Sequence, residues 1–533
     1  MSTAVFDVAI VGFGPSGAVA AATLGQAGLR VLVVDKSHTV YDKPRAVAMD
    51  HEIMRVLQGL GVAEAVQAYT EPFSASEHFG ADGQMIRRLA MLAPPYPMGW
   101  TPSLVFLQPP VEQILRDRVA ALPCVDVRLG LELVALAQDG EGVDLQLRGE
   151  DGAVEMARAR YVIGCDGASS AVRRFSGIGL EDLDFDEPWL VIDVQANAQG
   201  LAKLPQASAQ FCEPARPVSF IIGTGGHRRW EIMLLPGEDP REMEREEQVW
   251  KLLSRWITPD DATLWRRASY RFHALVAKAW RKDCVFIAGD AAHQQPPFLG
   301  QGMCQGVRDV TNLAWKLQQV LSAAPGGPGG WRDRLLNTYG EERGAHVREL
   351  TATIKGIGRY VCERDLGAAR ARDARLLADT GGVVKSVPRQ DLIPGLQTGC
   401  LSQQQHPARG SLFPQPRVLH RGKPVLLDDV AGGGWRVVLG GQAWAWQPLM
   451  RGTEVLGMQV LRVGTAPDAG LTAGSWQETE GVLATWFDRH ASAAAIVRPD
   501  HYVYAMADSA SSLDAELVAL SNQLATSQPW RHL

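Results

Sequence analysis

The first 35 residues alternate between apolar runs and breaks rich in glycine or polar side chains. Residues 5–11 form a mostly apolar run of strand length, and residues 31–34 form a second run that ends at Asp35. An alanine-rich stretch with helical spacing lies between them. This order predicts a strand, a tight loop, a helix and a second strand.

Two later apolar runs also end at a glycine and an acid. One ends at Asp166 and Gly167, and the other ends at Gly289 and Asp290. Strands of one parallel sheet present their carboxyl ends at a common edge, where open α/β sheets bind ligands. We therefore expect an extended ligand that crosses three strand ends of one sheet.

Between residues 181 and 275 the pattern changes to strands separated by turn glycines. Alternation along residues 229–234 places two sets of side chains on opposite faces. One set is Trp230, Ile232 and Leu234, and the other is Arg229, Glu231 and Met233. We expect the aromatic face of this sheet to cover a flat ring.

The rest of the chain divides by composition. Helical spacing over residues 331–379 predicts long helices, and the Gln-, Pro- and Gly-rich residues 398–416 predict a linker. The expected organisation is a first domain in two parts (1–180 and 276–395, the second with the long helices), an inserted sheet domain (181–275, joined by residues 72–107) and a C-terminal domain (411–533).

Composition limits the classes of function. With 46% apolar and 21% charged residues, the chain is typical of globular proteins, and its net charge of −6 does not favour nucleic acid. No apolar run approaches the roughly 18 residues of a membrane span. The 7 cysteines contain no Cys-x-x-Cys pair, so we expect neither a disulfide framework nor a metal site, and a cytoplasmic location fits.

The loop after the first strand reads Gly12-x-Gly14-x-x-Gly17. In this pattern Gly12 permits a sharp turn, Gly14 lets a pyrophosphate approach the backbone, and Gly17 lets the helix pack closely on the strand. Asp35 stands where an acid binds a ribose hydroxyl. The neighbouring residues that we expect to contact the dinucleotide are Pro15, Ser16 and Lys36.

These motifs, in this order, resemble the single-component FAD-dependent aromatic hydroxylases of the para-hydroxybenzoate hydroxylase fold. Segments such as FLQPPVEQIL (residues 106–115) and NTYGEERGAH (residues 337–346) are similar to the phenol and 3-(3-hydroxyphenyl)propionate hydroxylases of that family. The resemblance implies an α/β fold. It comprises a Rossmann-like FAD-binding domain of the glutathione reductase type 2 class, an inserted mixed β-sheet domain for the substrate and a thioredoxin-like C-terminal domain.

The resemblance also implies roles for individual residues around the flavin. Asp290 would bind the ribityl chain, while Pro297 would line the reactive edge with a wall that lacks N–H donors. The helix that begins near Gln301 would direct its N-terminus at the reduced flavin. The other residues expected to bind FAD by resemblance are Arg45, Gln108, Asp166, Gly289, Gly300, Gly302 and Met303. Cys304 stands where the family often has asparagine, and Arg173 is expected to support the Asp166 loop.

The activity implied is hydroxylation of a small phenol, ortho to its hydroxyl, with O2 as co-substrate and a C4a-hydroperoxyflavin as the oxygenating species. NADH or NADPH would visit transiently, because no second Gly-x-Gly-x-x-Gly domain follows. His227, Tyr270 and His273 are candidates to activate the phenol, and Pro297 would border the reacting atoms. Gln294 and Gln295 are expected to border the site. A homodimer is also expected.

Three alternatives remain open at this stage. The first is an oxygenase of the polyketide type, acting on a polycyclic phenol or performing a Baeyer–Villiger insertion. The second is a flavin halogenase, although the WAWQPL sequence at residues 444–449 has the wrong ending and position for that signature. The third is a flavin-bound sensor without catalytic turnover.

Overall fold

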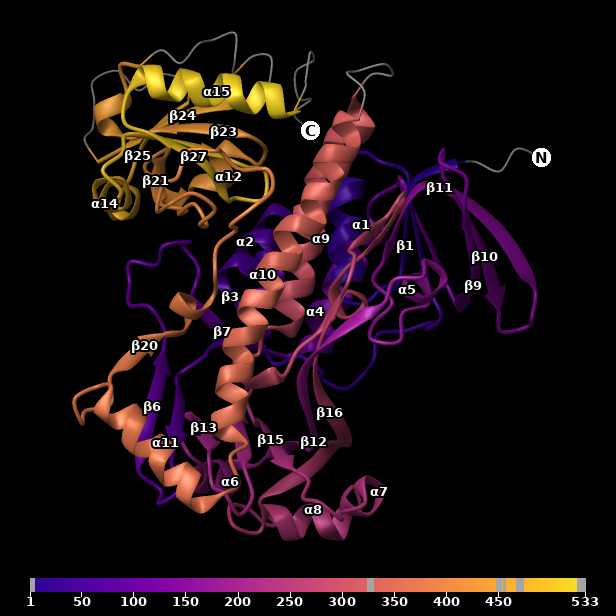
Figure 1. The fold of residues 1–533 in the computed structure, drawn as a ribbon, viewed down its shortest axis with the longest axis vertical. Coiled ribbons are helices and arrows are strands. Elements are labelled where there is room, and N and C mark those ends of the chain that lie inside the picture. Colours follow the sequence, from indigo (N-terminus) through magenta and orange to yellow (C-terminus); the bar gives the residue numbers. More distant parts are fainter. Residues whose placement is uncertain (1–4, 324–329, 447–452, 454–456, 466–473, 525–533) are drawn as a thin grey trace.

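The computed structural model describes residues 5–323, 330–446, 453, 457–465 and 474–524. Two large sheets and a smaller C-terminal sheet lie along the molecule, and the long helices α9 (Gly302–Ser322) and α10 (Trp331–Val361) run between them (Figure 1). The fold is therefore a mixed α/β fold, as predicted.

The first large sheet carries the predicted strand–loop–helix–strand unit, which is confirmed. Its main path has the order β17-β18-β11-β1-β2-β8, and β1 pairs in parallel with both β2 and β11. Helix α1 (Pro15–Gln26) connects β1 to β2. The strands are β1 (Val5–Val11), β2 (Val31–Asp35), β8 (Val125–Leu129), β9 (Leu131–Gln138), β10 (Val143–Gly149), β11 (Val154–Gly164), β17 (Arg281–Lys282) and β18 (Val285–Ile287).

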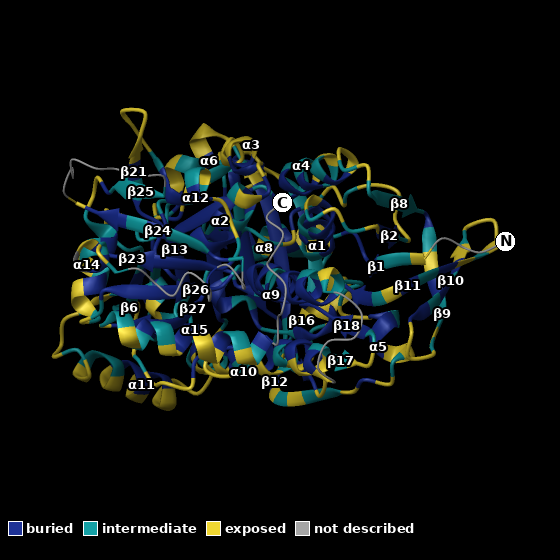
Figure 2. Cartoon of the chain, turned by 90° about the horizontal axis from the view of Figure 1, so that it is seen from above, coloured by how far each residue is buried: buried dark blue, intermediate teal, exposed yellow. Residues whose placement is uncertain are grey.

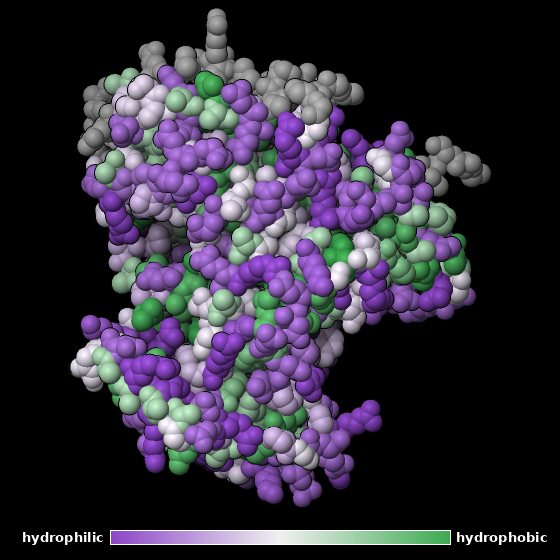
Figure 3. All heavy atoms as spheres, in the orientation of Figure 1, coloured by the Kyte–Doolittle hydropathy of each residue, from purple (hydrophilic) through white to green (hydrophobic). Residues whose placement is uncertain are grey.

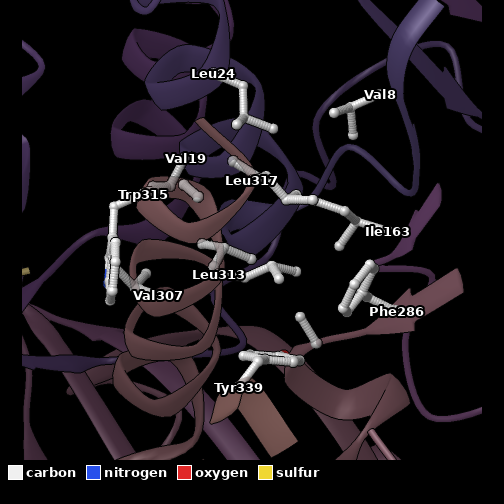
Figure 4. Packing of buried hydrophobic residues seen from close by; sticks show 14 of the residues in the cluster. Val8, Val19, Leu24, Ile163, Phe286, Val307, Leu313, Trp315, Leu317 and Tyr339 are labelled. Atoms are coloured by element: carbon white, nitrogen blue, oxygen red, sulfur yellow. The ribbon is translucent and has the colours of Figure 1, made fainter. Parts of the chain in front are cut away.

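Helices α1 and α9 pack beside each other over this sheet, and their apolar side chains interlock with those of the strands (Figure 4). Tyr339 of α10 adds a hydrogen bond from its hydroxyl to the carbonyl oxygen of Ile287, at 2.7 Å. Because β1, β11 and β18 run in the same direction, their carboxyl ends meet at one edge of this rigid core. Helices α2 (His51–Gly59), α3 (Ala63–Gln67), α4 (Gln108–Ala120) and α5 (Ala171–Phe175) complete this part.

The second large sheet has nine strands in the order β19-β16-β12-β15-β14-β13-β5-β6-β20. Most come from the segment in which strands were expected, and β5 and β6 come from the earlier segment expected to join it. The strands are β5 (Ser76–Phe79), β6 (Met85–Ala90), β12 (Leu180–Ala196), β13 (Ser208–Phe211), β14 (Val218–Ile222), β15 (His227–Met233), β16 (Ala262–Ala277), β19 (His293–Gln294) and β20 (Ser386–Pro388). Its helices are α6 (Ala198–Lys203), α7 (Pro240–Met243) and α8 (Glu246–Leu253).

One face of this sheet corrects a prediction. The aromatic set of β15, represented by Trp230 and Ile232, packs in a core with Val249 and Leu253 of α8. The charged set, which includes Glu231, faces the interior cavity instead. The expectation that the aromatic face of β15 covers the ligand is therefore wrong, because those side chains are needed to bury α8.

A short three-stranded sheet has the order β3-β7-β4. In sequence, its strands come between strands of the two large sheets (β3 Ala48–Asp50, β4 Thr70–Pro72, β7 Ser103–Phe106). Helix α11 (Leu366–Ala378) follows α10, so the predicted long helices are confirmed. Figure 2 shows buried strands at the centre and an exposed outer side on α11. Figure 3 shows apolar side chains gathered over the arm of β9, β10 and β11, where Val154 and Met156 are exposed.

The C-terminal unit is a five-stranded sheet of order β25-β24-β23-β26-β27, with β23, β24 and β25 parallel and β26 and β27 antiparallel to their neighbours. Its elements are β21 (Arg417–His420), β22 (Lys423–Leu426), α12 (Leu427–Ala431), β23 (Arg436–Leu439), β24 (Gln459–Gly464), β25 (Ser475–Gln477), α14 (Val482–Arg489), β26 (Ala494–Val497), β27 (Val503–Ala507) and α15 (Ala510–Leu524). The preceding segment has irregular backbone, as a linker should, but it is packed: Cys400, Phe413 and Gln415 are fully buried.

Buried ion pairs fasten this unit to the long helices. Arg498 bonds to Glu342 of α10 at 2.7 Å and to Asp500 at 2.6 Å. Lys316 of α9 bonds to the same Glu342 at 2.9 Å, and all of these side chains are almost completely buried. Among the helices of the described residues, none combines the length and the apolar character that a membrane-spanning helix requires.

Candidate active site

A cavity of about 910 Å³ lies where the carboxyl ends of the first sheet meet the inner face of the second. Its wall includes the loops that follow β1, β2, β11 and β18, the start of α9, and side chains from β12 to β16. This volume is within the range of ligand sites, and polar groups converge on it from both sheets. The cavity is therefore the candidate active site.

The three glycines of the first loop differ in which atoms a Cβ at each position would meet. Gly12 has φ +101°, and a Cβ there would lie 2.3 Å from the carbonyl oxygen of Cys165. A Cβ on Gly17 would lie 1.9 Å from the carbonyl oxygen of Gly12, so helix and strand touch at this point. A Cβ on Gly14 would meet no protein atom within 4 Å and would extend into the cavity, which Pro15 and Ser16 also line.

Asp35 and Lys36 line the cavity at the end of β2. The Asp35 carboxylate accepts hydrogen bonds from the backbone N–H groups of Phe13 at 2.6 Å and Ser37 at 2.7 Å. These bonds hold the acid beside the glycine loop, and its remaining acceptor capacity is available to a ligand hydroxyl.

Gln108 fixes the segment that carries Arg45. Its Oε1 accepts hydrogen bonds from the backbone N–H groups of Arg45 at 2.9 Å and Ala46 at 2.7 Å. From the other side, Arg229 donates to the carbonyl oxygens of Arg45 and Pro44, both at 2.7 Å. The Arg45 segment is thus held between helix α4 and the second large sheet.

The Asp166 carboxylate accepts hydrogen bonds from the backbone N–H groups of Ala171 at 2.6 Å and Val172 at 3.1 Å, and so stabilises the start of α5. Arg173 donates to the carbonyl oxygens of Ala168 at 2.7 Å and Ala291 at 2.9 Å. It is absent from the described cavity lining, which agrees with a supporting role.

The segment from Gly289 to Met303 forms another part of the cavity wall and begins beside Ser16 of the glycine loop. Gly289 donates its N–H to Asp309 at 2.9 Å, and Asp290 is exposed to the cavity. Gly300 has φ +57°, a left-handed conformation that favours glycine and ends the short turn begun at Pro297. The remaining predicted wall residues, Gln294, Gln295, Gly302 and Met303, also line the cavity.

Cys304 lies outside the described cavity lining and is fully buried. Burial raises the pKa of its thiol to about 12, so the group stays protonated at neutral pH. At the position where the family often has asparagine, this chain therefore has a small buried side chain that does not contact the cavity.

The three candidates to activate a phenol are in different positions. His227 is buried and absent from the described lining, and its Nε2 is 2.7 Å from Asp193. The geometry therefore does not support His227 as a substrate contact. Tyr270 and His273 do line the cavity, but the Tyr270 hydroxyl bonds to Arg266 and His273 lies 3.5 Å from Asp186.

Sequence reasoning missed a polar group on the inner face of the second sheet. Its members project into the cavity from neighbouring strands or the segment after β20: Gln210, Arg229, Glu231, Arg266 and Arg389. Asp193, fully buried, pairs with Arg229 at 2.7 Å and neutralises part of this charge. The alternation of side chains along β15 correctly placed Arg229 and Glu231 on one face of the strand. It did not show which of the two faces lines the cavity.

Two helix N-termini make the cavity suitable for FAD. Helices α1 and α9 begin at its wall, at Pro15 and Gly302, and neither has a side chain that caps its free N–H groups. Uncapped helix N-termini bind anions such as phosphate groups or a reduced flavin ring. The open space at Gly14 and the acids Asp35 and Asp290 then fit the phosphate, ribose and ribityl parts of FAD. No described cluster of His, Cys, Asp or Glu could hold a metal ion.

Comparison with known proteins agrees with this arrangement. A family model described as FAD binding domain matches residues 5–353. A probable NADH-specific resorcinol 4-hydroxylase from Rhodococcus jostii (strain RHA1) is 37% identical, over 97% of this chain and 94% of the relative. The chain belongs to the FAD-dependent aromatic hydroxylases. The cofactor of this hydroxylase is FAD, and O2 is its co-substrate.

Other comparisons extend over the whole hydroxylase. A 3-(3-hydroxy-phenyl)propionate/3-hydroxycinnamic acid hydroxylase from Klebsiella pneumoniae (strain 342) is 32% identical, with 97% of this chain and 94% of that protein covered. A model described as HcaD C-terminal domain matches residues 410–523.

Solved structures share the fold of this hydroxylase. The flavin-dependent monooxygenase PieE, in complex with FAD and substrate, aligns with a TM-score of 0.78 and 21% identity over 98% of this chain and 99% of that one. Aklavinone-11 hydroxylase with FAD and aklavinone aligns with a TM-score of 0.76 and 23% identity over 98% and 100%.

Proposed function

We propose that this hydroxylase uses NADH to hydroxylate a small phenol at a carbon ortho to a hydroxyl. The observation that carries the proposal is the meeting, in one cavity, of uncapped helix N-termini with the polar face of the second sheet. The first part suits FAD and the second suits a hydroxylated ring. Bound FAD supplies the oxygen-activating chemistry, and the oxygenating species remains a prediction.

Two relatives support particular features of the substrate and reductant. The 37% identical relative is named NADH-specific and a resorcinol 4-hydroxylase. Position 4 of resorcinol is ortho to one hydroxyl, which supports both the reductant and the regiochemistry proposed here. The roles assigned above to Asp35, Asp290 and the other cavity residues are part of the same proposal.

An aryl propionate is a second candidate substrate, because the cavity contains a buried arginine that could hold its carboxylate. Arg389 donates to the carbonyl oxygen of Leu299 and lies over the ring of Phe73, 5.0 Å from its centroid. None of the ion pairs within 4.0 Å among the described residues involves Arg389. A cation in this position would attract a substrate carboxylate.

The C-terminal unit is proposed to be thioredoxin-like but without redox activity. The order β24-β23-β26-β27, with β23 and β24 parallel, supports the first part. The last cysteine of the sequence is Cys400, so residues 411–533 hold no thiol. The cytoplasmic location and the homodimer remain predictions, and residues 447–449 of the tryptophan-rich sequence lie outside the described residues.

The test of the proposed function is oxidation of NADH and NADPH by the FAD-loaded protein, with product mass and H2O2 measured together. We expect resorcinol or 3-(3-hydroxyphenyl)propionate to stimulate NADH oxidation and to gain one oxygen. The Arg389→Met variant should lose the propionate preferentially if that is the substrate.

Other results would contradict the proposal in different ways. Product from polycyclic phenols alone would favour the polyketide-type alternative, and ring halogenation would favour the halogenase. Retained FAD without NADH or NADPH oxidation would favour a sensor. Stimulation that yields only H2O2 would identify an effector in place of a substrate.

A further inference from the structure

Glu231 lies at the centre of the inner face of the second sheet. It pairs with Ser219 of β14 on one side and with Val191 of β12 on the other. Its side chain lines the cavity, and only 6% of the residue is exposed. The carboxyl group is therefore placed deep in the substrate region and away from bulk solvent.

The Glu231 carboxyl group has no side-chain hydrogen bond or ion pair to any described residue. Some polar side-chain atoms of the described residues have no hydrogen-bond partner and are also completely shielded from solvent. The Glu231 oxygens do not belong to that group, so they reach the open space of the cavity. Burying an acid without a hydrogen-bond donor costs free energy unless a ligand supplies one. A phenolic O–H group is such a donor.

We propose that Glu231 is the catalytic residue that accepts the proton of the substrate's phenolic hydroxyl. This inference rests on the proposed function. In this step the substrate O–H bond breaks, an O–H bond forms on the carboxylate, and the bonding pair stays on the phenolic oxygen. The ring carbons ortho and para to that oxygen become more nucleophilic, which prepares the ortho carbon for oxygen transfer. Glu231 later returns this proton to the phenolic oxygen, and the carboxylate so regenerated accepts the second proton, which the oxygenated carbon loses while the C–H bonding pair restores the aromatic ring; that second proton then passes to solvent.

The surrounding charges leave Glu231 able to perform this role near neutral pH. Burial is the largest influence and raises its pKa to about 7, with Asp193 of β12 acting in the same direction. Arg229 on the same strand and Arg266 of β16 lower the pKa. The partner on β14 is the uncharged Ser219. A general base is most effective when its pKa is near the working pH.

The three side chains first considered for activating the phenol are all placed less favourably than Glu231. His227 has its Nε2 on Asp193, and its Nδ1 is buried without access to the cavity. Tyr270 bonds to Arg266, which is positively charged. His273 is on the rim beside Asp186. Glu231 is the group among these whose acceptor atoms are free to face a ligand.

The test is the Glu231→Gln variant, which preserves shape and removes the basic group. With resorcinol, kcat/KM for hydroxylation should fall by roughly 100-fold or more, the usual scale for losing a general base. In the unaltered protein kcat/KM should rise with pH through about 7, because the deprotonated carboxylate is the active form, and this rise should disappear in the variant. FAD content should not change.

Two further measurements separate a catalytic role from a structural one. A ring-fluorinated resorcinol that is already ionised at the assay pH and keeps a free ortho carbon should restore most of the activity of Glu231→Gln. The ultraviolet difference spectrum of bound phenol should show phenolate only when Glu231 is present. The matched control is Glu77→Gln in the same sheet, since Glu77 pairs with Arg88 and is absent from the described cavity lining.

Equal pH profiles for the unaltered protein and Glu231→Gln would overturn the assignment while leaving the proposed function intact. An equal loss with fluorinated and ordinary substrates would also overturn it, because a missing base is not needed for an ionised phenol. Failure of the unaltered protein to hydroxylate any phenol would instead contradict the proposed function itself.

Discussion

The Gly14→Val variant is expected to fold and to be purified without FAD. A Cβ at Gly14 meets no protein atom within 4 Å, and the residue has an ordinary φ of −74°, so the fold itself tolerates a side chain there. The added methyl groups would occupy the space in which a pyrophosphate approaches the start of α1. We expect FAD affinity to fall by at least about 100-fold, which corresponds to about 2.7 kcal/mol.

The measurement is FAD affinity, from fluorescence titration of apoprotein, together with the melting temperature of that apoprotein. Gly59→Val is a suitable control, because a Cβ at Gly59 also meets nothing within 4 Å but the residue is outside the described cavity lining. The control should bind FAD normally. Normal FAD affinity in Gly14→Val would show that the glycine loop does not hold the pyrophosphate.

Replacing Arg498 by methionine should lower the free energy of unfolding more than any other substitution proposed here. Arg498 is fully buried and pairs with Glu342 and Asp500, so its removal leaves acids in the interior with reduced compensation. Breaking a buried pair in this way costs about 3–5 kcal/mol. Urea unfolding of the FAD-loaded protein measures the change, and Arg489→Met, at an exposed position on α14, should stay within about 0.5 kcal/mol.

The pH dependence of this loss has a defined direction. Arg498 and Lys316 hold the pKa of Glu342 at about 2, against an ordinary value of 4.5. A lowered carboxyl pKa contributes stability above the unfolded value and loses it as the pH falls toward the folded value. The stability difference between the unaltered protein and Arg498→Met should therefore shrink between about pH 4.5 and pH 2. A difference that is constant over this range would contradict the assignment.

The nucleotide-binding core could be predicted from the sequence because its signals are local. The apolar run of β1, the glycines of the loop and the acid at the end of β2 lie within about 30 residues of one another, as the dinucleotide-binding fingerprint requires. The structure places them as expected, and the strand ends before Asp166 and Asp290 meet them at one edge. The start of α9 was also predicted to within one or two residues.

The substrate side could not be predicted in the same way because its burial depends on distant partners. Alternation separated Trp230 from Glu231, but only the packing of α8 decides which face is internal. Burying the charge of Arg229 would cost free energy if it had no partners. Asp193 and carbonyl groups of the Arg45 segment accept hydrogen bonds from its guanidinium group and offset that cost. His227 was predicted to activate the phenol because histidine is a common general base. In the structure its side chain bonds to Asp193 inside the protein and does not contact the cavity. The segment before β21 was correctly expected to be irregular, but its burial arises from contacts with the C-terminal unit.

The central claim is that one atom of O2 enters a phenol in the cavity between the two sheets. The most direct measurement is mass spectrometry of the product formed from resorcinol and NADH under ¹⁸O2, with H2¹⁸O in a parallel reaction. The account predicts a product that contains one labelled oxygen from O2 and none from water. An unlabelled hydroxylated product, or consumption of O2 that yields only H2O2 with every phenol tested, would contradict it.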